Sequence, residues 1–112
     1  PLGFIVLLFE QHEETSSSTK IVVVDIGCRV IANSTVDGNV TASCMIELKD
    51  CSCYIAIASD TKFVTVFNIY NLEVKSRGFI MDIADEIEYS KEDERLLLLT
   101  RSGDLLKYEI VE

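Results

Sequence analysis

Side chains that could serve as acids, bases or nucleophiles are few in this 112-residue sequence. His12 is the only histidine and stands in the polar stretch 10–20, so a triad or proton shuttle would depend on one loop residue. A second candidate is the group of carboxylates at Asp82, Asp85, Glu86 and Glu88. Nothing in the surrounding sequence would raise a carboxyl pKa, so we interpret the group as a solvated acidic face. The sequence therefore predicts no catalytic residues and no enzyme activity.

The cysteines are the remaining candidates for reactive or metal-binding chemistry: Cys28, Cys44, Cys51 and Cys53. A single residue separates Cys51 from Cys53, whereas about two to four residues usually separate the paired ligands of structural zinc sites. We therefore expect no metal and no cofactor, and we interpret the cysteines as small hydrophobic residues with free thiols. The sequons at Asn33 and Asn39 keep one alternative open, a secreted, glycosylated and disulfide-linked β-domain.

The charge of the chain limits the partners that it can bind directly. Ten basic and nineteen acidic side chains give a formal net charge of −9, whereas free-standing nucleic-acid binders present a basic surface. We therefore expect no direct DNA binding, and any contact with a nucleic acid would run through a basic partner. No apolar run reaches membrane-spanning length, so we expect no membrane association.

Lys62 and Arg101 are the candidate binding residues, because each stands at the tip of a predicted hairpin in a chain with few basic residues. Either could contact an acidic partner or a phosphate group. The planar guanidinium of Arg101 suits such a ligand better than the strongly hydrated ammonium of Lys62, so we expect Arg101 to contribute more. The alternative is that both are ordinary solubilising turn residues.

The stretch 53–68 predicts the β-hairpin that positions Lys62. Tyr54–Ala58 and Phe63–Phe67 are rich in β-branched and aromatic residues, and the four polar residues Ser59–Lys62 join them. Both runs are apolar at nearly every position, so both faces of the hairpin must be covered. The sequence therefore predicts a stack of sheets.

The rest of the chain also predicts strands. We expect them over 4–9, 21–26, 28–32, 42–48, 72–76, 80–89, 96–100 and 105–111, with 80–89 starting as a strand or as one helical turn. We expect polar loops over 10–20 and 33–39, and turns at 49–52, 77–78, 90–94 and 101–104. The predicted fold class is all-β.

The predicted hairpins recur along the chain. Ser59–Phe67 aligns with Thr100–Tyr108, 41 residues later. Further matches are Ile46 with Ile87 and Leu48 with Tyr89 at the same offset, and Thr19–Val24 with Thr61–Val66 at an offset of 42. A period of about 40–45 residues with four short strands per unit is typical of the blades of a β-propeller.

This period divides the chain into blades. We interpret residues 1–3 as the remnant of an expression tag, 4–32 as a partial first blade, 40–77 as a complete middle blade and 80–112 as a partial last blade. The predicted fold is thus about two and a half antiparallel, four-stranded blades. A closed propeller needs roughly four to eight, so either the chain is a fragment or several copies assemble, and we favour the fragment.

The middle and last units resemble WD-repeat blades. Phe67-Asn68 and Tyr108-Glu109 stand where that family has a Trp-Asp dipeptide at the end of the third strand, although its Gly-His pair is absent. Within that family, YIAIASDTKFVTVF (54–67) and LLLLTRSGDLLKYEIVE (96–112) resemble hairpins of the non-catalytic WD-repeat subunit of tRNA (guanine-N7-)-methyltransferase. The strand, acidic-serine loop and strand over 4–26 are similar to the opening of that subunit.

This resemblance implies a scaffold that holds a separate catalytic methyltransferase subunit and helps to present tRNA to it, in the nucleus or the cytoplasm. Arg101 stands where that family has a basic residue in a Ser-Gly-Asp turn, which implies a contact with the partner or with tRNA. The alternative within the same fold is a WD-repeat adaptor of another intracellular complex.

Overall fold

The computed structural model describes residues 3–48, 50 and 52–110. Within these residues the strands are β1 (Phe4–His12), β2 (Ser17–Asp25), β3 (Val30–Asp37), β4 (Val40–Glu47), β5 (Cys53–Ser59), β6 (Phe63–Asn68), β7 (Val74–Phe79), β8 (Ala84–Ser90), β9 (Arg95–Thr100) and β10 (Leu105–Glu109). Predictions that concern residues 1, 2, 49, 51, 111 and 112 lie outside the described residues. The described part of the chain forms no helix long and apolar enough to cross a membrane.

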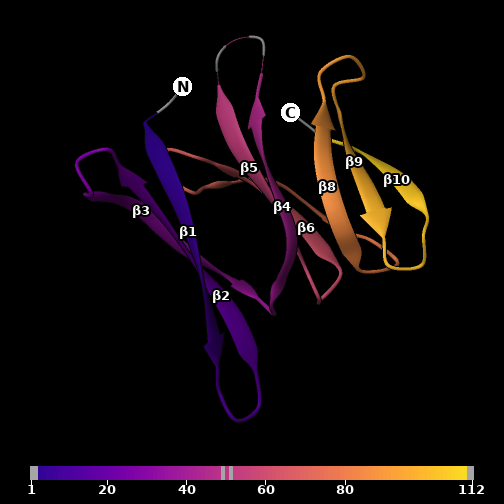
Figure 1. Cartoon of the computed structure of the whole chain (residues 1–112), viewed down its shortest axis with the longest axis horizontal. Helices are drawn as coiled ribbons and strands as arrows, with labels where there is room; N and C mark the ends of the chain where they lie inside the picture. Colours follow the sequence, from indigo (N-terminus) through magenta and orange to yellow (C-terminus); the bar gives the residue numbers. More distant parts are fainter. Residues whose placement is uncertain (1–2, 49, 51, 111–112) are drawn as a thin grey trace.

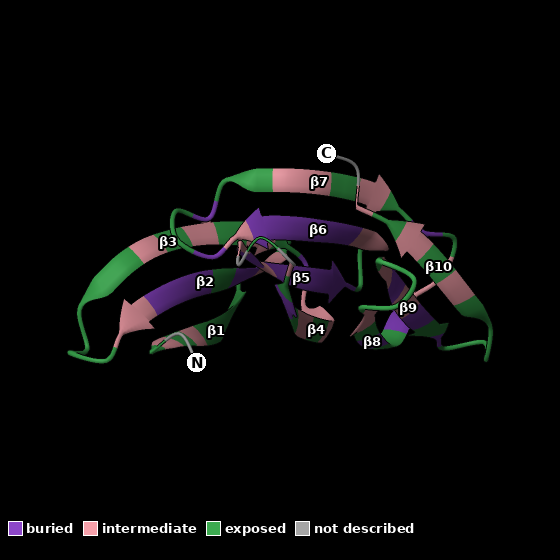
Figure 2. Cartoon of the chain, turned by 90° about the horizontal axis from the view of Figure 1, so that it is seen from above, coloured by how far each residue is buried: buried purple, intermediate pink, exposed green. Residues whose placement is uncertain are grey.

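The strands build three antiparallel sheets with the orders β1-β2-β3, β4-β5-β6-β7 and β8-β9-β10. Figure 1 shows these first, middle and last sheets arranged in chain order, with the four-stranded sheet between the other two. In Figure 2, β5 and β6 are largely purple, because the middle sheet is covered on both faces. The prediction of an all-β chain built from stacked antiparallel sheets is confirmed.

Strand β5 shows why nearly every residue of the central hairpin is apolar. Side chains alternate between the two faces of a strand. Ile55 and Ile57 pack in a buried cluster with residues of the first sheet, whereas Ala56 and Ala58 pack in a second cluster with residues of the last sheet. Each strand position therefore meets another sheet instead of water.

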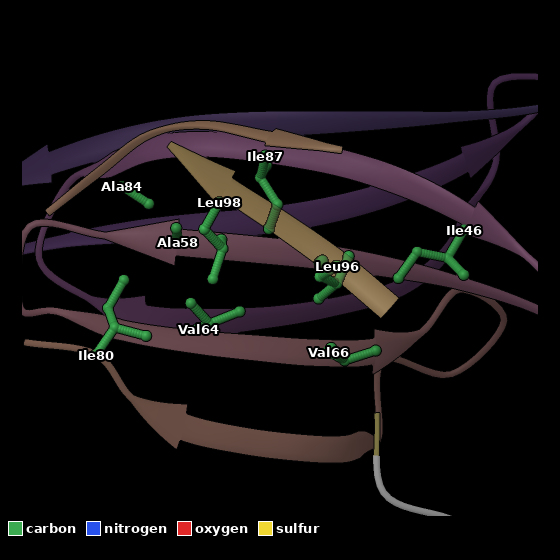
Figure 3. Close-up of a cluster of buried hydrophobic side chains, with 10 residues drawn as sticks. Ile46, Ala58, Val64, Val66, Ile80, Ala84, Ile87, Leu96 and Leu98 are labelled. Carbon is green, nitrogen blue, oxygen red and sulfur yellow. The ribbon is translucent and has the colours of Figure 1, made fainter. Parts of the chain in front are cut away.

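Two apolar interfaces hold the sheets together. The first interface joins the first and middle sheets through Ile21, Val23, Ile55, Ile57 and Phe67. The second interface joins the middle and last sheets through Val64, Val66, Ile87, Leu96 and Leu98, which converge in Figure 3. Each interface also holds a thiol, since Cys53 is buried in the first and Cys44 packs against the second.

Polar contacts add to the second interface. The hydroxyl of Thr41 on β4 donates to the backbone carbonyl of Ala84 on β8 over 2.6 Å. The hydroxyls of Ser76 on β7 and Tyr108 on β10 lie 2.8 Å apart. Hydrogen bonds thus join the middle and last sheets at two places, between β4 and β8 and between β7 and β10.

The predicted offset of 41 residues between the two best hairpins is confirmed by their backbone hydrogen bonds. The N–H of Lys62 donates to the carbonyl of Ser59 over 3.0 Å, and the N–H of Gly103 donates to the carbonyl of Thr100 over the same distance. The hairpins β5–β6 and β9–β10 therefore have the same turn.

The alignment of β2 with β6 is wrong by one residue. The register of β2 with β3 shifts between Val23 and Val24, and the register of β6 with β7 shifts between Val66 and Phe67. Val23 therefore corresponds to Val66, and Ile21 corresponds to Val64 and not to Phe63. Since Val23 faces the middle sheet as Val66 faces the last sheet, an error of one residue exchanges the two faces of the strand.

The alignment of β4 with β8 is wrong by three residues. Ser43 pairs with Ile57 and Ile87 pairs with Leu98, which is the residue that corresponds to Ile57. Ile87 therefore corresponds to Ser43 and not to Ile46. The turn between β4 and β5 is longer than the turn between β8 and β9, and this difference shifts the first strand of the last blade.

Several predicted boundaries differ from the structure, including those of β3, β7 and β8. Residues 10–12 and 17–20 continue β1 and β2, because their backbones pair in register although their side chains are polar. Most of the predicted loop 33–39 belongs to β3, and the predicted turn 77–78 lies inside β7. The stretch that precedes β8 contains no helical turn in the described residues.

Candidate functional site

Arg101 lies in the exposed turn between β9 and β10, where Asp85 holds its guanidinium. Its Nη2 and Nε atoms are 2.9 and 3.2 Å from Oδ1 of Asp85. This hydrogen bond and the charge of Asp85 raise the pKa of Arg101, and the charges of Asp82 and Asp60 act in the same direction. An acidic ligand must therefore compete with Asp85 for this group.

Lys62 ends the turn between β5 and β6, where it adopts a left-handed backbone with a φ of 70°. Its carbonyl accepts a hydrogen bond from the N–H of Ile80 over 2.8 Å. Gly103 takes the corresponding position in the β9–β10 turn, with a φ of 93°. Lys62 and Arg101 thus lie in corresponding turns but at different positions of them.

The carboxylates before and in β8 have separate environments. Asp82 accepts hydrogen bonds from the N–H groups of Ile83 and Ser102, and the hydrogen bonds from Ser102 and Ile83 lower its pKa to about 2. Asp85 pairs with Arg101. Glu86 and Glu88 are exposed on β8. A general acid needs a raised pKa, so the arrangement of Asp82 is the opposite of what acid catalysis requires.

His12 is the last residue of β1, and its Nε2 atom lies 3.5 Å from Oε2 of Glu10 in an exposed pair. Cys28 is an exposed free thiol, Cys44 is a half-buried one and Cys53 is buried, whereas Cys51 is not among the described residues. Burial, together with the charge of Glu88, raises the pKa of Cys44 to about 11. In the described ranges no three histidine, cysteine or acidic side chains gather closely enough to hold a metal.

A groove with a volume of about 660 Å³ opens on the described surface. The ends of β4, β8 and β10 meet at this end of the molecule, which lies at the top in Figure 1. We call this hollow the acidic groove, and it is lined by Glu47, Leu48, Asp50, Tyr89, Lys91, Asp93, Glu94, Glu109 and Ile110.

The acidic groove combines negative charge with an apolar lining. Five carboxylates face one ammonium among its lining residues, and Leu48, Tyr89 and Ile110 supply apolar surface. Two carboxylates are held in place, since Asp50 accepts hydrogen bonds from Ser52 and Glu109 pairs with Arg95 at 3.1 Å. The Ser52 hydrogen bonds lower the pKa of Asp50, which keeps that group charged. The groove can therefore receive a ligand with a cationic head and an apolar stem.

Sequence reasoning missed this groove, because its residues come from separate segments whose ends meet only after the sheets stack. One signal was present in the sequence. The first turn of the middle unit and the first turn of the last unit both carry acidic residues, at Glu47 and Asp50 and at Asp93 and Glu94. Stacked blades bring corresponding turns to one end of the molecule, so this recurrence points to one acidic surface.

Comparison with known structures finds several similar folds. BBS1N in its complex with ARL6DN superposes with a TM-score of 0.73 at 14% identity, over 93% of this chain and 36% of that chain. BamB from Moraxella catarrhalis gives a TM-score of 0.65 at 9% identity, over 96% and 34%. The computationally designed protein Ika4 gives 0.67 at 10% identity, over 91% and 64%.

The β-propeller folds of BBS1N and BamB superpose on all three stacked sheets. The three sheets have the fold of part of a β-propeller, in an open and incomplete arrangement. The sheets are therefore blades, and the acidic groove lies at the ends of the middle and last blades. This chain spans about a third of the length of BBS1N and BamB. No protein-family model and no curated protein sequence matches it.

Proposed function

We propose that this chain is a non-catalytic scaffold that binds a basic segment of a protein partner in its acidic groove. The observation that carries the proposal is the gathering of five carboxylates around Leu48, Tyr89 and Ile110 at the end of two adjacent blades. Lysine and arginine match such a surface, because their aliphatic stems pack on apolar groups while their charged heads meet the carboxylates.

Within this class we propose the non-catalytic WD-repeat subunit of a tRNA (guanine-N7-)-methyltransferase, in the nucleus or the cytoplasm. The stretches that resemble this family, 54–67 and 96–112, cover the two hairpins that share one turn geometry. The catalytic subunit would supply the basic segment. With a net charge of −9 on this chain, tRNA would be bound through the complex and largely by that subunit.

The second candidate is an adaptor of another intracellular complex. BBS1N, which has a similar fold over 36% of its length, was crystallised in complex with ARL6DN. A secreted, disulfide-linked domain is a third class, and the free thiols of Cys28 and Cys44 favour an intracellular chain over it.

Reversal of charge in the groove tests the proposal. We expect Glu47→Lys with Asp93→Lys to weaken capture of the catalytic methyltransferase subunit at least about tenfold, because both exposed carboxylates line the groove. The matched control is Glu13→Lys with Glu14→Lys, which makes the same change of charge in the exposed β1–β2 turn. Equal loss in both variants would show an effect of net charge alone and would contradict the groove as the binding site.

The identity of the partner distinguishes the candidates. Reconstitution of tRNA methylation with the catalytic subunit would support the methyltransferase scaffold, whereas repeated recovery of ubiquitin-ligase components would support another adaptor. Titration of thiols in denaturant separates the third class, because four reactive thiols are expected of an intracellular scaffold and none of a disulfide-linked secreted domain.

A further inference from the structure

The first blade leaves one of its faces uncovered. Phe4 and Val6 pack toward the middle blade, so alternation turns Ile5, Leu7 and Phe9 to the other side. These three side chains are 54, 39 and 49% exposed. A row of three large apolar residues on a regular strand is unusual for a surface that meets water.

The last blade also leaves one face uncovered. Leu96 and Leu98 pack toward the middle blade, which turns Leu97 and Leu99 outward. Leu105 pairs with Leu99 across β9 and β10 and is 62% exposed. Paired residues share a face, so these leucines form one apolar patch.

Each open face corresponds to one face of the middle blade, and those two faces of the middle blade are the ones that pack against the first and last blades. Register places the outward residues of β1 at the positions that Ile55 and Ile57 occupy in the middle blade, on the face that receives the first blade. The outward Leu97 and Leu99 correspond to Ala56 and Ala58, on the face that receives the last blade. The open face of the first blade is therefore of the type that receives a preceding blade, and the open face of the last blade is of the type that receives a following blade. The first and second interfaces each join one face of each type.

Both open faces carry charged residues of both signs. Lys20 is exposed beside Phe9 on the open face of the first blade, where Asp37 pairs with Ser18. On the open face of the last blade, Glu86 and Glu88 lie next to Leu99 and Leu97, and Lys107 pairs with Leu97. Carboxylates are thus in excess on the last blade, so two last blades would bring like charges together, whereas the first blade presents Lys20 to this acidic face.

We propose that two copies of this chain associate head to tail, with the first blade of each copy stacked on the last blade of the other. Both contacts repeat the sheet-on-sheet packing of the first and second interfaces. Three blades in each copy give six in the assembly, which lies within the range of roughly four to eight blades of closed propellers. A heterologous contact of this kind closes into a ring when its rotation is right.

Sedimentation velocity of the chain at increasing concentration tests the proposal directly. We expect reversible conversion from the 12.5-kDa monomer to a dimer of twice that mass. Because each copy carries a charge of −9, salt should strengthen the association by screening repulsion between the copies. A monomer at every concentration and salt would overturn the proposal without any variant.

Two substitutions test which faces meet. Phe9→Glu alters the open face of the first blade and keeps a favourable cross-strand pair with Lys20, and Leu105→Glu alters the open face of the last blade. We expect each variant alone to be monomeric, with an unchanged circular-dichroism spectrum. An equimolar mixture of the two should recover dimers, because one pair of unaltered faces remains.

The double variant mixed with the wild-type chain is the matched control, and we expect no mixed dimer. If Leu105→Glu alone associates as strongly as the wild type, the first blades meet each other and the head-to-tail arrangement is wrong. If the mixture of single variants stays monomeric while the wild type dimerises, the two open faces do not meet and the proposal is likewise overturned.

Discussion

The ring of Tyr108 on the last blade lies directly against the backbone of Gly78 on the middle blade. A Cβ atom at position 78 would come within 2.5 Å of Cε2 and 2.8 Å of the hydroxyl oxygen of Tyr108. The same hydroxyl lies 2.8 Å from Oγ of Ser76. Gly78 thus provides the space in which an aromatic ring joins the outer strands of two blades.

We expect Gly78→Ala to destabilise the chain by about 1–3 kcal/mol, because the added methyl group overpacks the second interface. If the Tyr108 ring were absent, alanine should stabilise this strand relative to glycine. The contact with the ring therefore decides whether Gly78→Ala stabilises or destabilises the chain. Urea unfolding measures the change. The double variant with Tyr108→Leu should recover part of the loss, and a stabilised Gly78→Ala single variant would contradict the contact.

Lys62→Gly should stabilise the chain by roughly 0.5–1 kcal/mol. A left-handed backbone strains lysine, and the gain exceeds the added entropy of glycine in the unfolded chain. Gly103 already occupies the corresponding position with a φ of 93°. Gly103→Ala is the matched opposite change and should destabilise the chain by about 1 kcal/mol. Thermal melts of both variants check the signs.

Asp85 occupies the Nε and Nη2 atoms of Arg101, so the full guanidinium meets a phosphate or a carboxylate of a partner only when the ion pair opens. We therefore expect Asp85→Asn to strengthen binding of the reconstituted methyltransferase–tRNA complex, and Arg101→Glu to weaken it by roughly tenfold or more. Because the ion pair is exposed, the melting temperature should change little in either variant. Unchanged affinity in both variants would make Arg101 a turn residue without a binding role.

Acidification should remove the contribution of Asp82 to stability. Its pKa of about 2 in the folded chain lies below the usual 3.8, so the carboxylate stabilises the fold above the usual value. This contribution is lost as the pH falls from about 4 to 2. The difference in urea midpoint between the wild type and Asp82→Asn should therefore be constant near neutral pH and shrink below pH 4. A difference that grows on acidification would have the wrong sign.

The sequence sufficed for the hairpins and for the stacking of sheets, because both depend on local patterns. A strand that is apolar on both faces must be covered by another sheet on each face, and β5 lies between the first and last blades as predicted. The 41-residue repeat is confirmed for one pair of hairpins, 59–67 and 100–108, whose strands are joined by the same short turn.

The sequence failed where polar residues continue a strand or connections differ in length. Thr19 is fully buried and bonds to the carbonyl of Gly38 over 3.0 Å, yet its polar neighbours made it resemble a loop residue. Errors of one residue in β2 and of three residues in β8 then exchanged the faces of these strands. The acidic groove was out of reach for a related reason, since its walls meet only after the blades stack.

The placement of one thiol in each interface turns the cysteines into reporters of blade separation. Cys53 is sealed between the first and middle blades with 2% of its surface exposed, and Cys44 lies at the contact of the middle and last blades. An alkylating reagent reaches Cys53 only when the first blade lifts away, whereas exposed Cys28 reacts without any opening. The rates of modification at Cys53 and Cys44 therefore measure how often the first and the second interface open, without any substitution in the chain.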